Sequence, residues 1–254
     1  MGVVNITPDS FSDGGRFFGV AEAITHARRL ADEGADIVDI GGESTRPGAA
    51  PVSEDEELRR VLPVLEELRE LCVSVDTRRP GVMKAALEAG ASMINDVQAL
   101  QAPGALDALR GTECAVCLMH MKGEPATMQR EPHYDDVVAE VRSFLAERAA
   151  VAEAAGVAPT RIVVDPGFGF GKTVEHNLVL LTRLRELSQR PVAVGLSRKS
   201  TLGKLTGRPV GERLAGSLTM ALLALEGGAT ILRVHDVKET RDVIAVWQAV
   251  QAAK

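Results

Sequence analysis

Hydrophobic residues recur along the chain at two spacings. Short aliphatic runs, such as residues 162–164, are typical of buried strands, and longer stretches with an apolar residue every three or four positions are typical of helices. The predicted strands are 3–6, 37–40, 72–75, 93–97, 115–119, 162–164, 192–196 and 231–234. The predicted helices are 20–33, 53–71, 80–89, 103–110, 135–155, 175–187, 211–226 and 239–252.

An internal repeat supports this division. The segments EGADIVDI, EAGASMIND and EGGATILRVHD each run from the end of a helix through glycine and alanine into an aliphatic strand. Repeated strand–helix units with short connections imply a parallel sheet. Eight such units in 254 residues predict an α/β fold, a (β/α)8 TIM barrel forming a single domain over residues 1–254. A doubly wound open sheet is the alternative.

Polar side chains follow nearly every predicted strand. In a TIM barrel the active site lies at the C-terminal ends of the strands. The residues at these ends are Asn5, Asp39, Glu43, Arg46, Asp76, Asn95, Asp96, His120, Asp165, Ser197, Arg198, Lys199, Ser200, Arg233, His235 and Asp236. Singly, each is as easily a loop cap or a structural ion pair. Together they predict a site at one rim.

The rim residues suit two kinds of ligand group. Asp76, Asn95 and Asp165 can hydrogen-bond a flat heterocycle that carries amidine-like N–H groups. The cations that follow later strands, Lys199 and Arg233 with His235, suit an anion, and Arg46 is a further candidate.

The first loop and the segment after residue 164 add to this site. Asn5, Asp9 and Asp13 are oxygen ligands suited to Mg²⁺. In DPGFGFGK, glycines alternate with Phe168 and Phe170, whose rings can cover a flat ligand. The alternative is a glycine-rich turn capped by Asp165.

Composition narrows the function further. The formal net charge of −6, without a basic stripe, argues against a nucleic-acid partner. The odd count of three cysteines (Cys72, Cys114 and Cys117) in aliphatic surroundings suggests reduced core thiols in a cytoplasmic protein. No signal peptide or long apolar span is visible, so no membrane association is expected.

Eight motifs along the chain resemble one enzyme family. NITPDSFSDGG, GGESTRPGA, SVDT, NDV, CLMHM, DPGFGFGK, SRKS and RVHDVKET, in this order and over essentially the whole chain, are similar to the signatures of dihydropteroate synthases. The resemblance implies a transferase of folate biosynthesis with a TIM barrel, usually homodimeric and inhibited by sulfonamides. It implies condensation of 6-hydroxymethyl-7,8-dihydropterin pyrophosphate with p-aminobenzoate to 7,8-dihydropteroate and pyrophosphate.

The same resemblance assigns roles to residues. Those implied to be catalytic are Asp165, Lys199, Arg233 and His235. The pterin would be bound by Asp76, Asn95, Met119, Asp165, Phe170 and Lys199. Pyrophosphate would be met by Asn5, Thr45, Arg46, Arg233 and His235, with Asn5 also on Mg²⁺. The p-aminobenzoate site would be framed by Phe11, Thr45, Pro47, Phe168, Lys199 and Ser200.

The family and the chemistry agree on a dissociative substitution. Mg²⁺ and Arg233 with His235 would stabilise the leaving pyrophosphate, and Asp165 the cationic pterin. One departure is that the chain starts directly before its first strand, so N-terminal cap residues usual in the family are expected to be missing.

Three alternatives remain open. A pterin-binding methyltransferase domain shares the barrel and the Asp/Asn/Asp set, but SRKS, RVHDV and STRPG argue against it. A Schiff-base aldolase would use Lys199, although no neighbouring feature in the sequence suggests the depressed pKa it needs. A catalytically silent paralogue would bind pterin only.

Overall fold

Strands and helices alternate along the chain in the computed structural model, which describes residues 1–6, 16–44, 51–124, 127–187 and 189–253. Within these ranges the strands are β1 (Gly2–Asn5), β2 (Val38–Gly41), β3 (Val73–Asp76), β4 (Met93–Asp96), β5 (Ala115–Met119), β6 (Ile162–Asp165), β7 (Ala193–Val194) and β8 (Ile231–Leu232). The α-helices are α1 (Arg16–Asp32), α2 (Glu54–Glu67), α3 (Pro80–Glu88), α4 (Ala105–Ala108), α5 (Val137–Ala154), α6 (Val174–Thr182), α7 (Ser200–Thr206), α8 (Leu214–Glu226) and α9 (Val237–Ala252). Short 3-10 turns are η2 (Pro159–Arg161), η3 (Leu184–Glu186) and η4 (Val210–Glu212).

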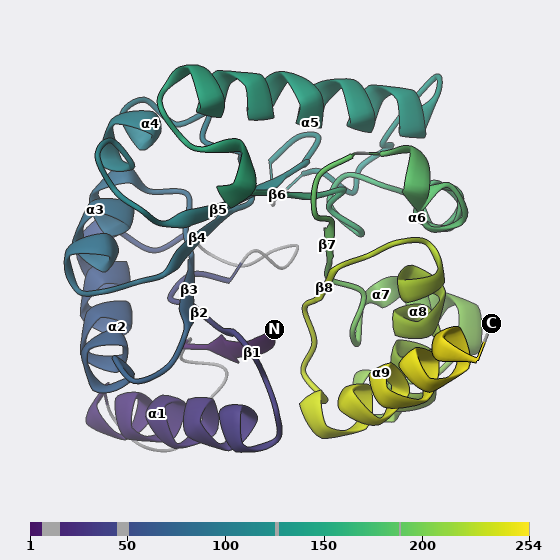
Figure 1. The fold of residues 1–254 in the computed structure, drawn as a ribbon, viewed down its shortest axis with the longest axis horizontal. Helices are drawn as coiled ribbons and strands as arrows, with labels where there is room; N and C mark the ends of the chain where they lie inside the picture. The colour runs from purple at the N-terminus through teal and green to yellow at the C-terminus, as the bar shows by residue number, and fades with distance from the viewer. Residues whose placement is uncertain (7–15, 45–50, 125–126, 188, 254) are drawn as a thin grey trace.

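The strands close into a barrel. Strands β1 to β6 pair in parallel in sequence order, and β7 pairs with β8. Two parallel bridges, Val164 with Val192 and Gly2 with Val234, join these two groups. Figure 1 shows the resulting ring of strands with the helices around it. The predicted TIM barrel is therefore confirmed. The open doubly wound sheet is excluded, because the two bridges pair both edge strands of the six-stranded sheet, β1 and β6, with the β7–β8 pair.

Alternate strand residues face two different cores. One set, including Val4, Ile40, Ile94 and Val164, packs against the helices in the large outer core. The other set faces the barrel axis, where Met93, Cys117, Val163 and Ala193 form a small cluster. Because successive side chains in a strand point to opposite faces, the residue two positions further along faces the axis again.

The internal repeat has a common hydrogen-bond pattern. Gly34, Gly90 and Gly228 all have positive φ, of 98°, 106° and 92°, at the end of a helix. The alanine after each glycine donates its amide to a helix carbonyl five residues back, at 2.9 Å in all three cases. This left-handed cap turns the chain from each helix into the next strand.

Two details differ from the sequence prediction. Helix α7 was not predicted, because its Gly203 weakens the helical signal. A Cβ at Gly203 would lie 2.2 Å from Nη2 of Arg213, so a larger residue here would have to displace the end of that side chain. The helix predicted over 53–71 ends at Glu67, although Ser53 caps it as expected by accepting from the Glu56 amide at 3.2 Å.

The cysteine prediction was correct for two residues of three. Cys114 and Cys117 are buried, whereas Cys72, in the connection just before β3, is exposed. All three thiols are free. Among the described residues, no helix has both the length and the apolar character needed to cross a membrane.

Candidate active site

The strand parity places several polar residues above the axial cluster. Asn95 and Asp165 lie two positions after Met93 and Val163, at the ends of β4 and β6. Arg233 likewise lies two positions after Ile231, directly beyond β8. The rim predicted from the sequence therefore has a physical basis, since these side chains share the inward face of the barrel.

Arg233 joins two carboxylates across this rim. Its Nε donates to Oδ2 of Asp39 at 2.6 Å, and its Nη2 donates to Oδ2 of Asp76 at 2.8 Å. Asp39 also accepts from Nδ2 of Asn95 at 3.3 Å, and its buried Oδ1 has no hydrogen-bond partner among the described residues. Burial opposes the charge of Arg233, but Asp39 and Asp76 hold its pKa above the usual value. The cation is thereby fixed at the axis.

The single charge of Arg233 is shared between two carboxylates, the buried Asp39 and the partly exposed Asp76. Burial first, together with Asp39 and more distant acidic groups, raises the pKa of Asp76 to about 7 despite Arg233. Asp165 is also buried, and burial raises its pKa while Lys199 and Arg233 oppose the rise. Oδ1 of Asp165 accepts from the Gly167 amide at 2.7 Å.

Lys199 lies against the glycine-rich loop that follows β6. Its Nζ donates to the carbonyl of Phe168 and lies 4.8 Å from the centre of the Phe170 ring. Burial lowers the pKa of Lys199 to about 8. The ring of Phe168 packs in the outer core and is only 1% exposed. What Phe168 offers the rim is therefore its carbonyl oxygen rather than a ring that could cover a ligand.

Two contacts tie the β7 and β8 loops together. Nδ1 of His235 lies 3.1 Å from Oγ of Ser197. Arg198, in a left-handed conformation with φ 58°, pairs with Asp236, its Nε donating at 3.0 Å. Ser200, the first residue of α7, is exposed beside Lys199. These contacts place His235 and Lys199 on neighbouring loops.

The alternating glycines allow backbone segments to approach closely. Gly167 has φ 66°, and a Cβ there would lie 1.9 Å from the His120 carbonyl oxygen. Gly171 has φ 63°, with the carbonyl oxygen of Lys122 at 2.2 Å from a Cβ. Only glycine fits at either position. The loop after β6 is thus packed directly on the chain after β5.

Not every predicted rim residue joins this site. Asp96 faces outward and caps its own turn, accepting from the amides of Gln98 and Leu100 at 2.8 and 2.7 Å. His120 packs edge-on against Phe144, with ring centres 4.9 Å apart. Met119 and Phe170 do lie at the rim, Met119 in register with Asp165. Six predicted site residues lie outside the described part of the chain: Asp9, Phe11, Asp13, Thr45, Arg46 and Pro47.

Comparison with known proteins gives the family. The chain matches the pterin binding enzyme family over residues 1–235. It is 50% identical to the dihydropteroate synthase of Escherichia coli strain K12 over 259 aligned positions, covering 100% of this chain and 92% of that protein.

The chain belongs to the dihydropteroate synthase family.

Solved structures of the family agree. A Yersinia pestis dihydropteroate synthase in complex with a sulfonamide drug superposes with a TM-score of 0.94 at 47% identity, covering 99% of this chain and 94% of that one. A Burkholderia cenocepacia dihydropteroate synthase complexed with 7,8-dihydropteroate gives 0.91 at 50% identity, covering 100% and 91%. As a family member the chain is an enzyme of the transferase class, as the sequence motifs implied.

Two residues of this family member were not recognised as important from the sequence. Asp39 was counted at the rim without a role, although a carboxylate inside an aliphatic strand is a detectable signal. Lys172 is the last residue of the DPGFGFGK motif, and the sequence predicts no separate role for it. In the structure it is buried beneath the loop, with Nζ 2.9 Å from Nδ1 of His120. No local pattern distinguishes it from a surface lysine.

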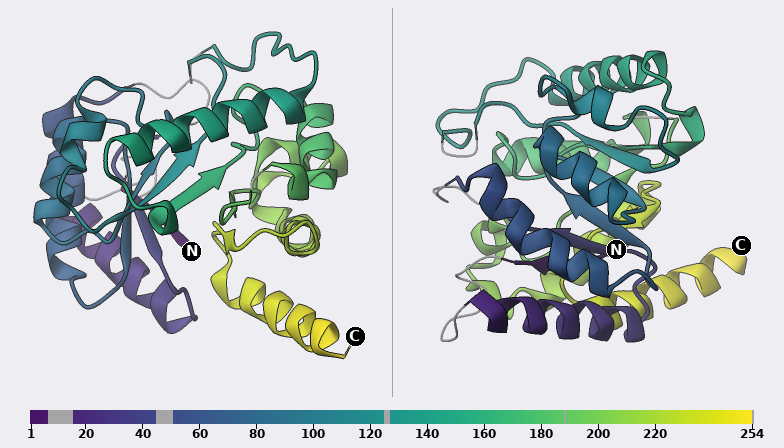
Figure 2. Two further views of the ribbon diagram at one scale, coloured as in Figure 1. Left: turned by 45° about the horizontal axis from the view of Figure 1, so that its top comes forward. Right: turned by 90° about the vertical axis from the view of Figure 1, so that its left-hand side faces the viewer.

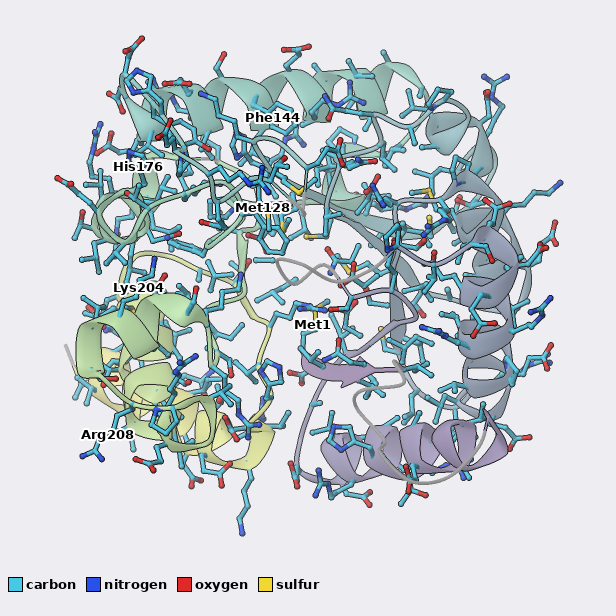
Figure 3. All side chains as sticks on the ribbon, turned by 180° about the vertical axis from the view of Figure 1, so that it is seen from behind. Met1, Met128, Phe144, His176, Lys204 and Arg208 are labelled. Carbon is cyan, nitrogen blue, oxygen red and sulfur yellow. The ribbon has the colours of Figure 1, made fainter. Side chains whose placement is uncertain are left out.

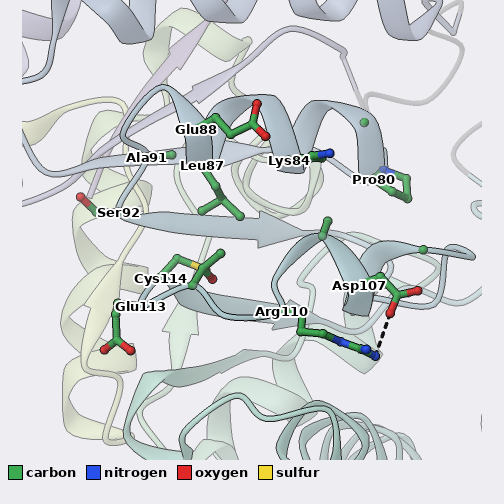
Figure 4. Close-up of a pocket in the computed structure, with 14 residues that line it drawn as sticks. Pro80, Lys84, Leu87, Glu88, Ala91, Ser92, Asp107, Arg110, Glu113 and Cys114 are labelled. Carbon is green, nitrogen blue, oxygen red and sulfur yellow. Dashed lines mark hydrogen bonds and ion pairs between the residues drawn. The ribbon is translucent and has the colours of Figure 1, made fainter.

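A groove of about 880 Å³ lies away from this rim. Figure 4 shows it on the outer surface between α3 and α4, with Lys84 and Leu87 on one side and Asp107 and Arg110 on the other. Asp107 and Arg110 pair with each other at 3.0 Å. The groove shares no residue with the rim site and plays no part in the chemistry below.

Proposed function

We propose that this chain is a dihydropteroate synthase: it joins 6-hydroxymethyl-7,8-dihydropterin pyrophosphate to p-aminobenzoate and releases pyrophosphate. The observation that carries the proposal is the placement of hydrogen-bonding carboxylates and fixed cations on one inward-facing rim. The product-complexed and drug-complexed relatives support it, because 7,8-dihydropteroate contains both the pterin and the p-aminobenzoate portions.

The acidic half of the rim suits the pterin. Asp76 and Asn95 are register neighbours on β3 and β4, and Asp165 lies across the axis on β6. Carboxylates that accept paired N–H groups would recognise the 2-amino-pyrimidine edge of the ring. Lys199 over Phe170, with Met119 near Asp165, would bound the faces of the ring.

The cationic half suits the leaving group. Arg233 is held at the axis by Asp39 and Asp76, and His235 lies on the same loop. Charge that develops on the departing pyrophosphate would be stabilised by these fixed donors without reorganisation. Asp165 would stabilise the positive charge left on the pterin, so that the weakly basic arylamine attacks without a strong general base.

Magnesium is compatible with the residues present. In the described ranges, no group of three or more His, Cys, Asp or Glu side chains is placed to hold a metal ion. Mg²⁺ usually keeps several waters and binds through one or two protein oxygens plus substrate phosphates, so a single side chain such as Asn5 at the end of β1 suffices. When bound, the ion would neutralise charge on the leaving phosphates.

The p-aminobenzoate end of the site is proposed next to Lys199. Ser200 is exposed there and would meet the carboxylate of that substrate. Phe11, Thr45, Arg46 and Pro47, all outside the described residues, are proposed to complete its walls and the pyrophosphate contacts.

The deciding experiment is pyrophosphate release. The protein with the pterin pyrophosphate and Mg²⁺ should release pyrophosphate rapidly only when p-aminobenzoate is added, and 7,8-dihydropteroate should form in equal amount. Pterin binding by calorimetry without turnover would instead indicate a catalytically silent pterin binder. Methyl transfer from a methylated pterin would favour the methyltransferase alternative.

We also propose that two copies of the chain associate. Exposed large aliphatic side chains gather on the last helices: Leu205, Leu214, Leu222, Leu223, Val246 and Val250. Figure 2 shows α9 projecting beyond the rest of the molecule, and Val246 on it is 66% exposed. Exposed apolar side chains on helices that contact one another favour an interface. Sedimentation of the protein should show a dimer, and Leu223→Lys should shift it toward monomer.

A further inference from the structure

The ammonium group of Lys172 is buried beneath the glycine-rich loop. Its side chain is 2% exposed, and Nζ lies 3.0 Å from the carbonyl oxygens of both Gly167 and Phe170. It also lies 2.9 Å from Nδ1 of His120 and 3.4 Å from the His120 carbonyl oxygen. In its protonated form Lys172 has three N–H donors for these four acceptors, two of which lie within the loop, and burial lowers the pKa of this ammonium group to about 7.

The same loop also provides two contacts of Lys199. The carbonyls of Gly167 and Phe170 bind Lys172, and the intervening carbonyl of Phe168 binds Nζ of Lys199. The Phe170 ring lies under Lys199 at 4.8 Å. Since carbonyl directions in so short a segment depend on one another, a change at Lys172 shifts both contacts of Lys199.

We propose that Lys172 is a positioning residue. By binding the Gly167 and Phe170 carbonyls, it fixes the Phe168 carbonyl and the Phe170 ring that contact Lys199, and it thereby sets the affinity of the rim for a pterin. The inference rests on the proposed function, because it takes the ligand beside Lys199 to be a pterin. Lys172 itself touches no ligand in this scheme.

The surroundings of His120 fit this role. Burial first, then the Lys172 cation, lowers the pKa of His120 to about 3, so the imidazole is neutral. With Lys172 as donor, Nδ1 accepts and the proton sits on Nε2. The ring is held edge-on against Phe144 of α5, which lies on the same side of the molecule as His176 of α6 (Figure 3). Lys172 is thus oriented by a fixed acceptor.

Other side chains hold the rest of the loop. Oδ1 of Asn177 accepts from the Gly169 amide at 2.8 Å, and the Tyr134 hydroxyl donates to the Gly171 carbonyl at 2.9 Å. Gln129, which is exposed, donates to the Gly169 carbonyl. The chain can therefore keep its course after β6 when Lys172 alone is changed, so the effect on Lys199 can be measured in a folded protein.

A double-mutant cycle tests the proposal. Lys172→Met keeps the length and apolar stem of the side chain but removes every donor. Calorimetry would measure the dissociation constant of 6-hydroxymethylpterin, which lacks pyrophosphate, for wild type, Lys172→Met, Lys199→Met and the double variant. We expect Lys172→Met to weaken binding about tenfold in the wild-type background but less than about twofold when Lys199 is already methionine, because contacting groups are not additive. A merely structural role gives equal losses in both backgrounds and overturns the proposal, as does no loss at all.

Lys122→Met is the matched control. Lys122 lies on the neighbouring segment, and its Nζ binds the His133 carbonyl at 2.7 Å and Glu140 at 3.0 Å rather than the loop carbonyls. Binding should be unchanged in this variant. A loss equal to that of Lys172→Met would mean that charge alone matters, against the positioning role.

A surface variant keeps the proposal testable if Lys172→Met does not fold. Gln129→Ala removes another donor to the same loop without disturbing the core. It should weaken pterin binding about two- to threefold in the wild-type background and not in Lys199→Met; additive losses, or none, would count against loop positioning. Wild-type protein that fails to bind pterin would refute the proposed function instead, which separates the two failures.

Discussion

Arg233 donates to Asp39 at 2.6 Å although the two residues are 194 positions apart in the chain. The pair joins the last strand of the barrel to the second. Asp39 has no exposed surface. A buried carboxylate thus fixes the cation on which the anion-binding half of the site depends.

Removing Asp39 should destabilise the fold and misplace Arg233. Breaking a buried ion pair from one side typically costs about 3–5 kcal/mol, because the remaining charge is left unpaired. Because Asp76 still binds Arg233, the loss of stability in Asp39→Ala should lie toward the lower end of this range. Urea unfolding measures this change in the free energy of unfolding. Asp36→Ala, which removes an exposed partner of Arg241 3.5 Å away, should change stability by less than about 0.5 kcal/mol. Equal stabilities for the two variants would contradict the prediction.

Arg233→Ala should separate the two halves of the substrate. We expect affinity for the pterin pyrophosphate to fall more than about tenfold, since charge-assisted bonds to phosphate are lost, while pyrophosphate-free pterin loses far less. Calorimetry with both ligands checks this. Arg233→Lys retains a cation for Asp39 and Asp76 and controls for unpaired carboxylates. Equal losses for both ligands would make Arg233 structural.

Asp165→Asn should weaken pterin binding and activity together while the fold persists. The amide presents N–H groups to the ligand's N–H groups, and loss of a charge-assisted bond costs roughly 1.5–3 kcal/mol, or about ten- to a hundredfold in affinity. Circular dichroism should be unchanged. Asp107→Asn, at an exposed position on α4, is the control. Near-normal pterin affinity in Asp165→Asn would remove this residue from the pocket.

The stability of the protein should carry a pH signature of Asp76. Its pKa is raised by burial from 3.8 to about 7. Between these values the folded protein keeps a proton that the unfolded chain has released, so this group lowers the unfolding free energy as pH rises from about 4 to 7. Asp76→Asn does not titrate. The stability of Asp76→Asn relative to wild type should therefore increase over this range and level off above it; parallel urea-unfolding curves at all pH values would show that Asp76 ionises normally.

Gly167→Ala should be far more costly than an alanine at another left-handed glycine. Both Gly167 and Gly111 have positive φ, 66° and 75°, but a Cβ at Gly111 meets no atom within 4 Å. Gly111→Ala should cost only the left-handed strain, about 1–2 kcal/mol. At Gly167 the collision with the His120 carbonyl adds to this strain, and thermal unfolding should show a loss of more than about 3 kcal/mol. Equal shifts would mean that the backbone moves aside freely.

The order of strands and helices could be predicted from the sequence because each strand–helix unit carries its own periodicity and its own glycine cap. The rim could be predicted for a similar reason: Asn95 and Asp165 end aliphatic strands whose alternation sets their direction. His120 directly follows the last residue of β5, Met119, and at this position the alternation turns its side chain outward, toward Phe144.

Contacts between distant segments could not be read in this way. The Phe168 ring is buried in the outer core, although its neighbours alternate as a ligand-covering loop would. Helix α7 forms although it contains Gly203, which lies against the Arg213 side chain, and Lys172 is buried by segments far from it in sequence. These features depend on three-dimensional packing, which local propensity does not encode.

The bridge between Gly2 and Val234 has a consequence for how the protein acquires activity. It joins nearly the two ends of the chain, so it has the kind of long loop closure that makes folding slow. Arg233 lies beside this bridge, and its amide is held by the Val194 carbonyl at 2.9 Å. During synthesis every residue proposed for the pterin half of the rim is made before Arg233, because all of them precede it in the chain. We expect pyrophosphate to be recognised only after the last strand has closed the ring. The first enzymatic turnover would therefore mark the completion of folding.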